Sequence, residues 1–220
     1  MTRFWPLLGA SALFAVLAFA CKGDGGTSKG ETPASSPALA PTPKTYSERP
    51  EVTISADKKY SAVVETTKGK FTIELRPDIA LQTVNSFIFL ARDGFYNGVT
   101  FHRVIRGVTG QPDFVAQTGD PTGTGSGGPG YTLPAEFSKE PYVSGTVGMA
   151  RTSDPNSAGS QWFITYNDKY QNALNGQYTV FGKVVKGMDV VASLRPRDPS
   201  NTATPQPEGD RIISIQIKEG

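Results

Sequence analysis

The stretch FHRVI at residues 101–105, followed by FVAQTGD at residues 114–120, is the part of this sequence that decides the fold. Bulky and β-branched residues fill both runs, and a glycine-containing loop separates them, which is typical of two adjacent strands. Alternation along the first run predicts that Arg103 shares one strand face with Phe101 and Ile105. An arginine beside two large apolar groups is unusual for a face that meets only solvent.

Six further runs have the same β-rich composition. The first two are joined through Lys68 and Gly69, which indicate a hairpin, and the last alternates isoleucines at positions 213, 215 and 217 onto one face. Turn residues separate the remaining runs. The pattern predicts eight strands, at residues 63–65, 71–75, 99–105, 114–118, 146–151, 161–166, 178–185 and 211–218.

Two segments have the periodicity of helices. A start signal at Pro77 opens the first, which runs to about Arg92 and places apolar residues at i, i+3, i+4 and i+7 from Val84. The second is short, from Met188 to Leu194. Many strands, two helices and glycine-rich connections predict a mainly β fold, a closed eight-stranded antiparallel barrel capped by two helices, because closure removes exposed strand edges.

Composition excludes several classes of function. The 220 residues include one Cys and one His, so a zinc site built from Cys and His and an intrachain disulfide are both excluded. The single histidine, His102, is expected to be a structural residue rather than a general base. Residues 51–220 hold 17 charges of each sign, so nothing resembles the basic stripe that nucleic-acid binding needs, and we expect no nucleic-acid partner.

The first 20 residues predict a signal peptide. Arg3 precedes an uncharged and largely apolar run from Phe4 to Ala20, whose length suits a signal peptide better than a membrane span. The only cysteine, Cys21, follows directly, and this arrangement resembles a bacterial lipoprotein, in which that thiol is acylated. The resemblance implies an exported protein of the cell envelope, anchored in a membrane through Cys21. The alternative is ordinary secretion with a free N-terminal cysteine.

The segment after Cys21 predicts a tether. Residues 22–50 contain 17 Gly, Pro, Ser or Thr among 29 residues, with only Leu39 and Tyr46 as large apolar groups. Such a composition buries too little surface to offset the entropy of ordering, so it predicts a flexible linker. The predicted organisation is therefore a signal peptide at 1–20, a lipidated cysteine and linker at 21–54, and a folded domain at 55–220.

The folded domain contains a series of motifs in a fixed order. After FHRVI and FVAQTGD come GTVGMAR at residues 145–151, NSAGSQWFI at 156–164 and LNGQYTVFGKV at 174–184. This series resembles the cyclophilin family of peptidyl-prolyl cis-trans isomerases, in its bacterial form, from about Ala62 to Ile217. The resemblance implies a cyclophilin-like barrel that catalyses rotation about X-Pro bonds. That reaction breaks no covalent bond and needs no metal or cofactor.

The resemblance also implies the roles of ten residues. Arg103 matches the catalytic arginine, whose fixed guanidinium lies beside the twisting amide. Gln117 matches a glutamine that binds substrate backbone and helps to hold this arginine in place. The aromatic and apolar members match the walls of the proline pocket, and the others match positions along the substrate. The predicted substrate-binding residues are Phe114, Val115, Ala150, Arg151, Gln161, Phe163, Leu174 and Tyr178. Without the resemblance, the aromatic residues and Leu174 would be interpreted as core packing.

The sequence departs from the family in one loop. Residues 106–111 form an insertion of about six residues between the arginine strand and Phe114, so the loop either rims the pocket or displaces Phe114.

The expected partners are proline-containing unfolded polypeptides, namely envelope or secreted proteins that the isomerase helps to fold, and we expect a monomer. The alternative is a catalytically weak module or chaperone of the same fold that only binds proline-containing peptides.

Overall fold

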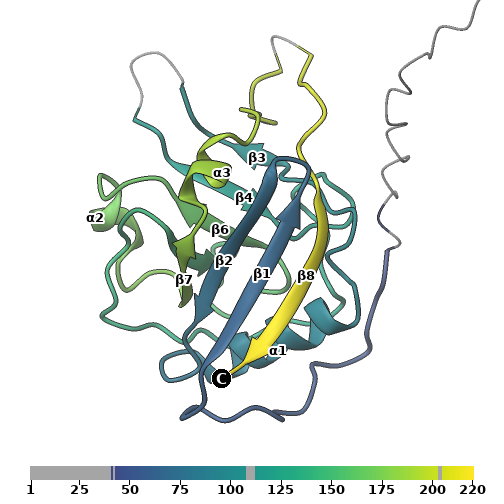
Figure 1. Cartoon of the computed structure of the whole chain (residues 1–220), viewed down its shortest axis with the longest axis vertical. Helices are drawn as coiled ribbons and strands as arrows, with labels where there is room; N and C mark the ends of the chain where they lie inside the picture. The colour runs from purple at the N-terminus through teal and green to yellow at the C-terminus, as the bar shows by residue number, and fades with distance from the viewer. Residues whose placement is uncertain (1–40, 42, 108–111, 203–204) are drawn as a thin grey trace, which may run out of the picture. The chain divides into compact units, whose positions relative to one another are not determined.

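Eight antiparallel strands form one curled sheet in the computed structural model, which describes residues 41, 43–107, 112–202 and 205–220 (Figure 1). The order across the sheet is β3-β4-β6-β5-β7-β2-β1-β8. The eight strands predicted from the sequence are thereby confirmed, with shifted ends. The strands are β1 Tyr60–Thr66, β2 Gly69–Leu75, β3 Arg103–Val104, β4 Val115–Thr118, β5 Thr146–Met149, β6 Trp162–Thr165, β7 Val180–Lys186 and β8 Ile212–Glu219.

The sheet is an open half-barrel, so the predicted closed barrel is wrong. Its two ends, β3 and β8, share no ladder of hydrogen bonds among the described residues. The chain just before β3 meets the start of β8 at one isolated bridge, Thr100 with Arg211, where the Phe101 N–H donates to the Asp210 carbonyl at 2.8 Å. Because β3 is only two residues long, it offers too little edge for a full ladder.

Three helices accompany the sheet in the described part of the chain, where the sequence predicts two. The predicted long helix is present as α1 (Leu81–Arg92), and its apolar face from Val84 to Ala91 is buried as expected. The second predicted helix is the one-turn α3 (Met188–Ala192). The unpredicted α2 (Gln171–Leu174) is a single turn. Helix α1 packs against β8, and α3 packs against β2.

The apolar side chains form two separate clusters. The main core gathers aromatic rings from α1 and the sheet, including Phe87, Trp162 and Phe181. The second cluster contains Val115, Tyr142, Phe163, Leu174 and Val180. Strand β6 contributes to both, because consecutive side chains on a strand point to opposite faces: Trp162 lies in the main core and Phe163 in the second cluster.

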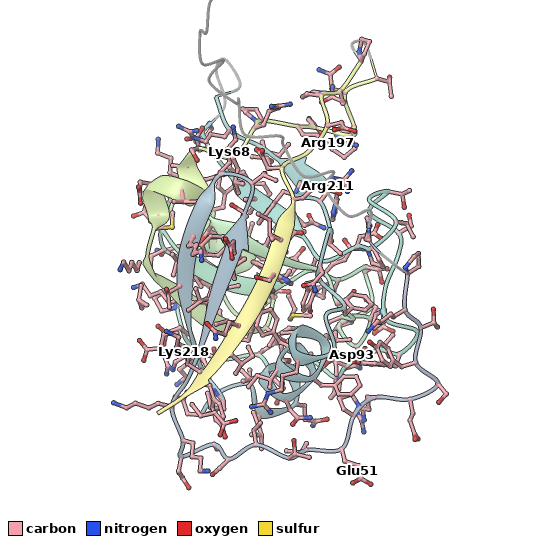
Figure 2. The ribbon with its side chains drawn as sticks, turned by 45° about the vertical axis from the view of Figure 1, so that its right-hand side comes forward. Glu51, Lys68, Asp93, Arg197, Arg211 and Lys218 are labelled. Carbon is pink, nitrogen blue, oxygen red and sulfur yellow. The ribbon has the colours of Figure 1, made fainter. Side chains whose placement is uncertain are left out.

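Residues 43–54, the end of the predicted linker, lie against the domain; we call this segment the strap. The Tyr46 N–H donates to the Pro129 carbonyl at 2.8 Å, and the Lys44 ammonium and Tyr46 hydroxyl each lie 2.7 Å from the Asp93 carboxylate at the end of α1. Figure 2 marks Asp93 near this end of α1 and Glu51 farther along the strap.

The strap continues along α1 beyond Tyr46. The Asn85 side chain donates to the Glu51 carbonyl at 2.9 Å and accepts from the Thr53 N–H at 3.0 Å. The predicted signal peptide, Cys21 and the first part of the linker lie outside the described residues. Within the described ranges, no helix has the length and apolar character that crossing a membrane requires.

Candidate active site

A cavity of about 280 Å³ opens over the second apolar cluster. Strands β3, β4 and β6 each supply side chains to it. The rest come from the residue just before β4, the segment after β5, the end of α2 and the segment between α2 and β7. The structure thus brings together nine of the ten residues predicted from the sequence. The lining residues are Arg103, Phe114, Val115, Gln117, Ala150, Arg151, Phe163, Leu174 and Tyr178.

Two tyrosine rings, those of Tyr142 and Tyr170, support the aromatic walls of this cavity. Phe163 is 5% exposed and stacks on Tyr142, with ring centroids 5.6 Å apart and an interplanar angle of 19°. Phe114 contacts the Tyr170 ring at 4.3 Å, and the Tyr170 hydroxyl donates to the Pro112 carbonyl at 3.2 Å. Sequence reasoning missed both tyrosines, because each reaches the site through a tertiary contact that no local periodicity signals.

Arg103 holds a positive charge at the edge of the apolar pocket. It is half-buried, and its Cζ atom lies 5.4 Å from the centroid of the Phe114 ring, within range of a cation–π interaction. On β3 it is the register partner of Gln117 in β4. A charged, planar donor group therefore stands beside an aromatic wall and an amide side chain.

The predicted pairing of Arg103 with Phe101 on one face is wrong. Phe101 is fully buried in the main core, where its ring contacts Trp162 edge-on at 6.2 Å. Val104 is buried in the same core. Regular alternation fails because the extended strand begins only at Arg103, so the positions before it do not follow the period of two.

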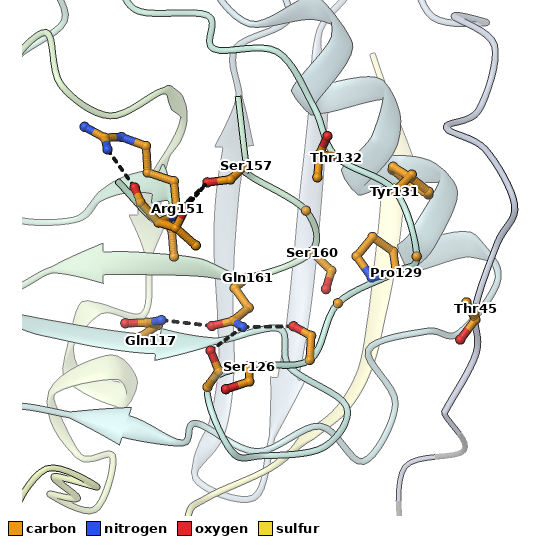
Figure 3. Close-up of a pocket in the computed structure, with 17 residues that line it drawn as sticks. Thr45, Gln117, Ser126, Pro129, Tyr131, Thr132, Arg151, Ser157, Ser160 and Gln161 are labelled. Atoms are coloured by element: carbon orange, nitrogen blue, oxygen red, sulfur yellow. Dashed lines mark hydrogen bonds between the residues drawn. The ribbon is translucent and has the colours of Figure 1, made fainter. Parts of the chain in front are cut away.

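Gln161, the tenth predicted residue, lies beside the cavity and connects it to the glycine-rich loop, which we define as residues 119–130. The Gln117 side-chain amide donates to the Gln161 side-chain oxygen at 3.0 Å, and the Gln161 amide donates to the carbonyls of Gly125 and Gly127, both at 2.9 Å (Figure 3). Gln161 lines a second cavity, of about 640 Å³. The two cavities share Gln117, Ala150 and Arg151.

The glycine-rich loop is organised around one buried carboxylate. Asp120 accepts hydrogen bonds from the Thr122 N–H and hydroxyl at 2.7 Å and from the Gly125 N–H at 2.6 Å. Burial alone would raise the pKa of Asp120, but these hydrogen bonds and one from Gly127 outweigh it and hold the pKa below its usual range. Gly125 adopts a φ of +88°, which favours glycine.

His102 lies near this loop and outside the lining of both cavities. It is 2% exposed, and burial lowers its pKa below the usual histidine value, with a smaller opposing effect from the Asp120 charge. A neutral, enclosed imidazole that lines neither cavity agrees with the structural role expected from the sequence.

Arg151 supports the part of the cavity wall that Tyr178 forms. Its guanidinium donates to the Gln177 carbonyl at 2.9 Å and to the Thr152 carbonyl at 2.8 Å, and its Cζ atom lies 4.5 Å from the centroid of the Tyr178 ring. Two loop segments that are distant in sequence are therefore tied together at the pocket rim.

The insertion leaves Phe114 in the pocket. At its described end, the Gly107 N–H donates to the Asp113 carboxylate at 2.7 Å, and the Arg106 guanidinium lies 3.6 Å from the same carboxylate. Phe114 follows directly and lines the 280 Å³ cavity. Of the two expectations for this loop, displacement of Phe114 is therefore wrong; residues 108–111 lie outside the described residues.

The chemistry of the cavity is that of binding and polarisation. Its lining combines aromatic and aliphatic surface with guanidinium groups and a carboxamide, a combination suited to an apolar ring beside a polarised amide. Across the described residues, no group of three or more His, Cys, Asp or Glu side chains is placed to hold a metal ion.

Residues 61–217 match the family profile of cyclophilin type peptidyl-prolyl cis-trans isomerases. The chain belongs to the cyclophilin family. A probable peptidyl-prolyl cis-trans isomerase of Brucella suis is 46% identical over 177 residues, which cover 74% of this chain and 85% of the relative. Peptidyl-prolyl cis-trans isomerase B of Bacillus subtilis is 44% identical over 128 residues, covering 57% of this chain and 83% of the relative.

Solved cyclophilins have the same fold. The crystal structure of a Cryptosporidium parvum cyclophilin type isomerase is 31% identical, covers 74% of this chain and 99% of its own, and superposes with a TM-score of 0.63. A crystal structure of that protein in the presence of the dipeptide Ala-Pro gives 33% identity and a TM-score of 0.62, with 73% and 99% covered. This cyclophilin is a peptidyl-prolyl cis-trans isomerase, as the sequence motifs indicate.

Proposed function

We propose that this cyclophilin isomerises X-Pro bonds in the 280 Å³ cavity, with Arg103 as the catalytic residue. The observation that carries the proposal is the position of the Arg103 guanidinium at the rim of a pocket whose walls are Phe114, Phe163 and Leu174. In this arrangement the proline ring lies against the aromatic walls, and the amide to be rotated lies beside the guanidinium.

Rotation about the bond is slow because amide resonance must be broken. The barrier is about 18–20 kcal/mol, and the uncatalysed exchange takes about 10–100 s. When the amide twists, its nitrogen regains a lone pair and becomes a better hydrogen-bond acceptor. A donor fixed at that position therefore binds the twisted amide more strongly than either planar isomer, which is the condition for catalysis.

Arg103 suits this task because a guanidinium is always charged and presents several donors in a rigid plane. Gln117, its register partner on β4, is held by its hydrogen bond to Gln161 and is positioned to bind substrate backbone. Under this proposal, the apolar walls fix the ring while the rest of the peptide turns. No proton is transferred, so no general base is required.

The substrate-binding proposal is tested with a pair of aromatic variants. Phe114→Ala removes a wall of the pocket and should raise the KM, or the Kd, for a short X-Pro peptide about tenfold or more. Phe137→Ala is the matched control, because Phe137 is 43% exposed and lines neither cavity. Nuclear magnetic resonance exchange spectroscopy on the full-length variants measures both binding and turnover. Equal effects of the two substitutions would contradict the assignment.

We also propose that this cyclophilin acts on unfolded, proline-containing segments of envelope or secreted proteins, as a monomer anchored through an acylated Cys21. The support is the apolar leader that ends at Ala20 and the Gly/Pro/Ser/Thr-rich tether that follows Cys21. Cys21→Ala should abolish incorporation of labelled fatty acid and release the protein from membranes. Retention on membranes without label would contradict the anchor. Secretion of unlabelled wild-type protein would favour the alternative, and sedimentation equilibrium tests the monomer.

A further inference from the structure

One residue lining the 640 Å³ cavity beside the active site comes from the strap, which precedes the first strand of the sheet. Most of its lining belongs to the glycine-rich loop and to the segments after β5 and before β6, but Thr45 lines it as well. Figure 3 shows Thr45 on the strap, at the opposite end of the cavity from Gln117. A residue of the predicted tether is thus part of a cavity that adjoins the proline pocket.

The strap is fixed at this position by a half-buried aromatic residue, Tyr46, which packs against the main core. The Tyr46 ring contacts three others, with ring centroids 5.2 Å from Phe89, 6.2 Å from Phe95 and 6.2 Å from Tyr131. Its hydroxyl donates to Asp93 at 2.7 Å. Because Tyr46 is held from both its ring and its hydroxyl, the neighbouring Thr45 has a defined place at the cavity.

The strap and the glycine-rich loop are in close contact. The Tyr46 N–H donates to the Pro129 carbonyl at 2.8 Å. Gly130 has a φ of +96°, and a Cβ atom there would lie 2.5 Å from the Tyr46 carbonyl oxygen and 2.6 Å from the Thr45 Cγ2 atom. Such an approach leaves no space for a side chain, so the glycine lets the strap pack directly on the loop backbone.

The loop in turn is bound to the proposed catalytic machinery. Gln161 donates to the carbonyls of Gly125 and Gly127 and accepts from Gln117. Since Gln117, Ala150 and Arg151 line both cavities, a peptide held by its proline ring extends directly into the larger one. Its volume of about 640 Å³ is ample for a long side chain.

We propose that Thr45 is a specificity-determining residue, which the tether contributes to the substrate-binding groove. It faces a substrate side chain that flanks the proline. The Arg151 guanidinium also lines the cavity, but it donates to the carbonyls of Gln177 and Thr152. Because the remaining polar lining consists of hydroxyl side chains, carboxamides and backbone groups, the favoured side chain is one with a hydroxyl or amide, such as Ser or Gln. This proposal rests on the proposed function, since it presumes that the proline ring occupies the smaller cavity.

The test places a charge at Thr45. In full-length protein, Thr45→Glu and Thr45→Lys are compared with Ser47→Glu and Ser47→Lys, which put the same charges on an exposed strap residue that lines neither cavity. The peptides carry Glu, Gln or Lys two residues before or two residues after proline. Both kcat/KM and the Kd are measured, the latter by fluorescence anisotropy. Thr45 is exposed, so neither substitution threatens folding.

The expected result is a shift of selectivity in opposite directions. Thr45→Lys should raise the preference for the Glu peptide over the Lys peptide about two- to fivefold, Thr45→Glu should reverse it, and the Ser47 pair should change it little. Wild-type protein should prefer the Gln peptide to one with Leu at the same position. Equal shifts from the two positions, or none, would overturn the proposal. If the wild type bound these peptides without turning them over, the proposed catalysis would fail, while the Kd values would still test Thr45.

Discussion

Replacing Arg103 with Ala is the most direct perturbation of the proposed mechanism. The substitution removes a charge-assisted donor that acts on the twisted amide in the pocket beside Phe114. Loss of one preorganised donor of this kind costs about 2.7–4 kcal/mol in the transition state. We therefore expect kcat/KM for a short X-Pro peptide to fall about 100- to 1,000-fold. Arg103→Lys keeps the charge but loses the planar fork of donors, so its kcat/KM should lie between those of wild type and Arg103→Ala.

The same substitution should hardly affect folding. Arg103 forms no salt bridge within 4 Å among the described residues, and its one aromatic contact, to Phe114, is a cation–π interaction. At a half-buried site such an interaction contributes about 1 kcal/mol, between the values for exposed and desolvated pairs. For a chain of this length, that corresponds to a fall in Tm of about 2–4 °C. The expected loss of transition-state stabilisation, about 2.7–4 kcal/mol, is therefore several times the expected loss of folding stability.

The assay uses a peptide whose cis and trans forms give distinct resonances, so that the exchange rate is measured without a coupling protease. Arg92→Ala serves as the matched control, because it removes a guanidinium that pairs with Glu219 on β8 and lines neither cavity. Its rate should stay within about twofold of wild type. Turnover by folded Arg103→Ala within about threefold of wild type would refute the role assigned to Arg103.

Three further predictions concern the support of the site. Glu136→Ala should lower the free energy of unfolding by about 1–2 kcal/mol in urea, because its carboxylate accepts hydrogen bonds from the N–H groups of Gln82 and Thr83 at the start of α1. Tyr142→Phe should raise it by about 1 kcal/mol, because this buried hydroxyl has no hydrogen-bond partner among the described residues; a fall would contradict that reasoning. His102 is kept neutral by burial, which lowers its pKa, so the unfolded state takes up a proton first. Stability should therefore fall as the pH drops below about 6.5, and His102→Gln should flatten that dependence in denaturation measured from pH 5 to 8.

The family resemblance predicted the residues of the site, and alternation along single strands agrees with where the structure places several of them. On β6, the period of two separates Trp162 from Phe163, and the structure sends the first into the main core and the second into the pocket cluster. On β4, Val115 and Gln117 both line the cavity, as their spacing requires. These predictions hold because both strands are paired on either side, which keeps the backbone extended and the side chains strictly alternating.

The same rule failed where pairing is incomplete. β3 pairs with β4 over two residues, and its other edge has only an isolated bridge, between Val104 and Arg197. The chain before it pairs with the residues at the start of β8 instead, and Phe101 turns into the main core. Whether the sheet closes into a barrel depends on how many residues of its two end strands, β3 and β8, pair with each other. A run such as 99–105 looks like one long strand in the sequence, although only the ladder formed in space fixes its length.

The strap shows the corresponding limit for composition. A segment rich in Gly, Pro, Ser and Thr predicts a flexible tether, because its average apolar content is too low to fold. Tyr46 is the one large apolar residue of the strap's first part. Its ring contacts three other aromatic rings, and its hydroxyl donates to the Asp93 carboxylate. One aromatic residue, together with the backbone and ionic contacts around it, attaches the end of the predicted tether to the folded surface. Because that surface includes the glycine-rich loop, the strap lies at the proposed substrate groove, where Thr45 lines the larger cavity.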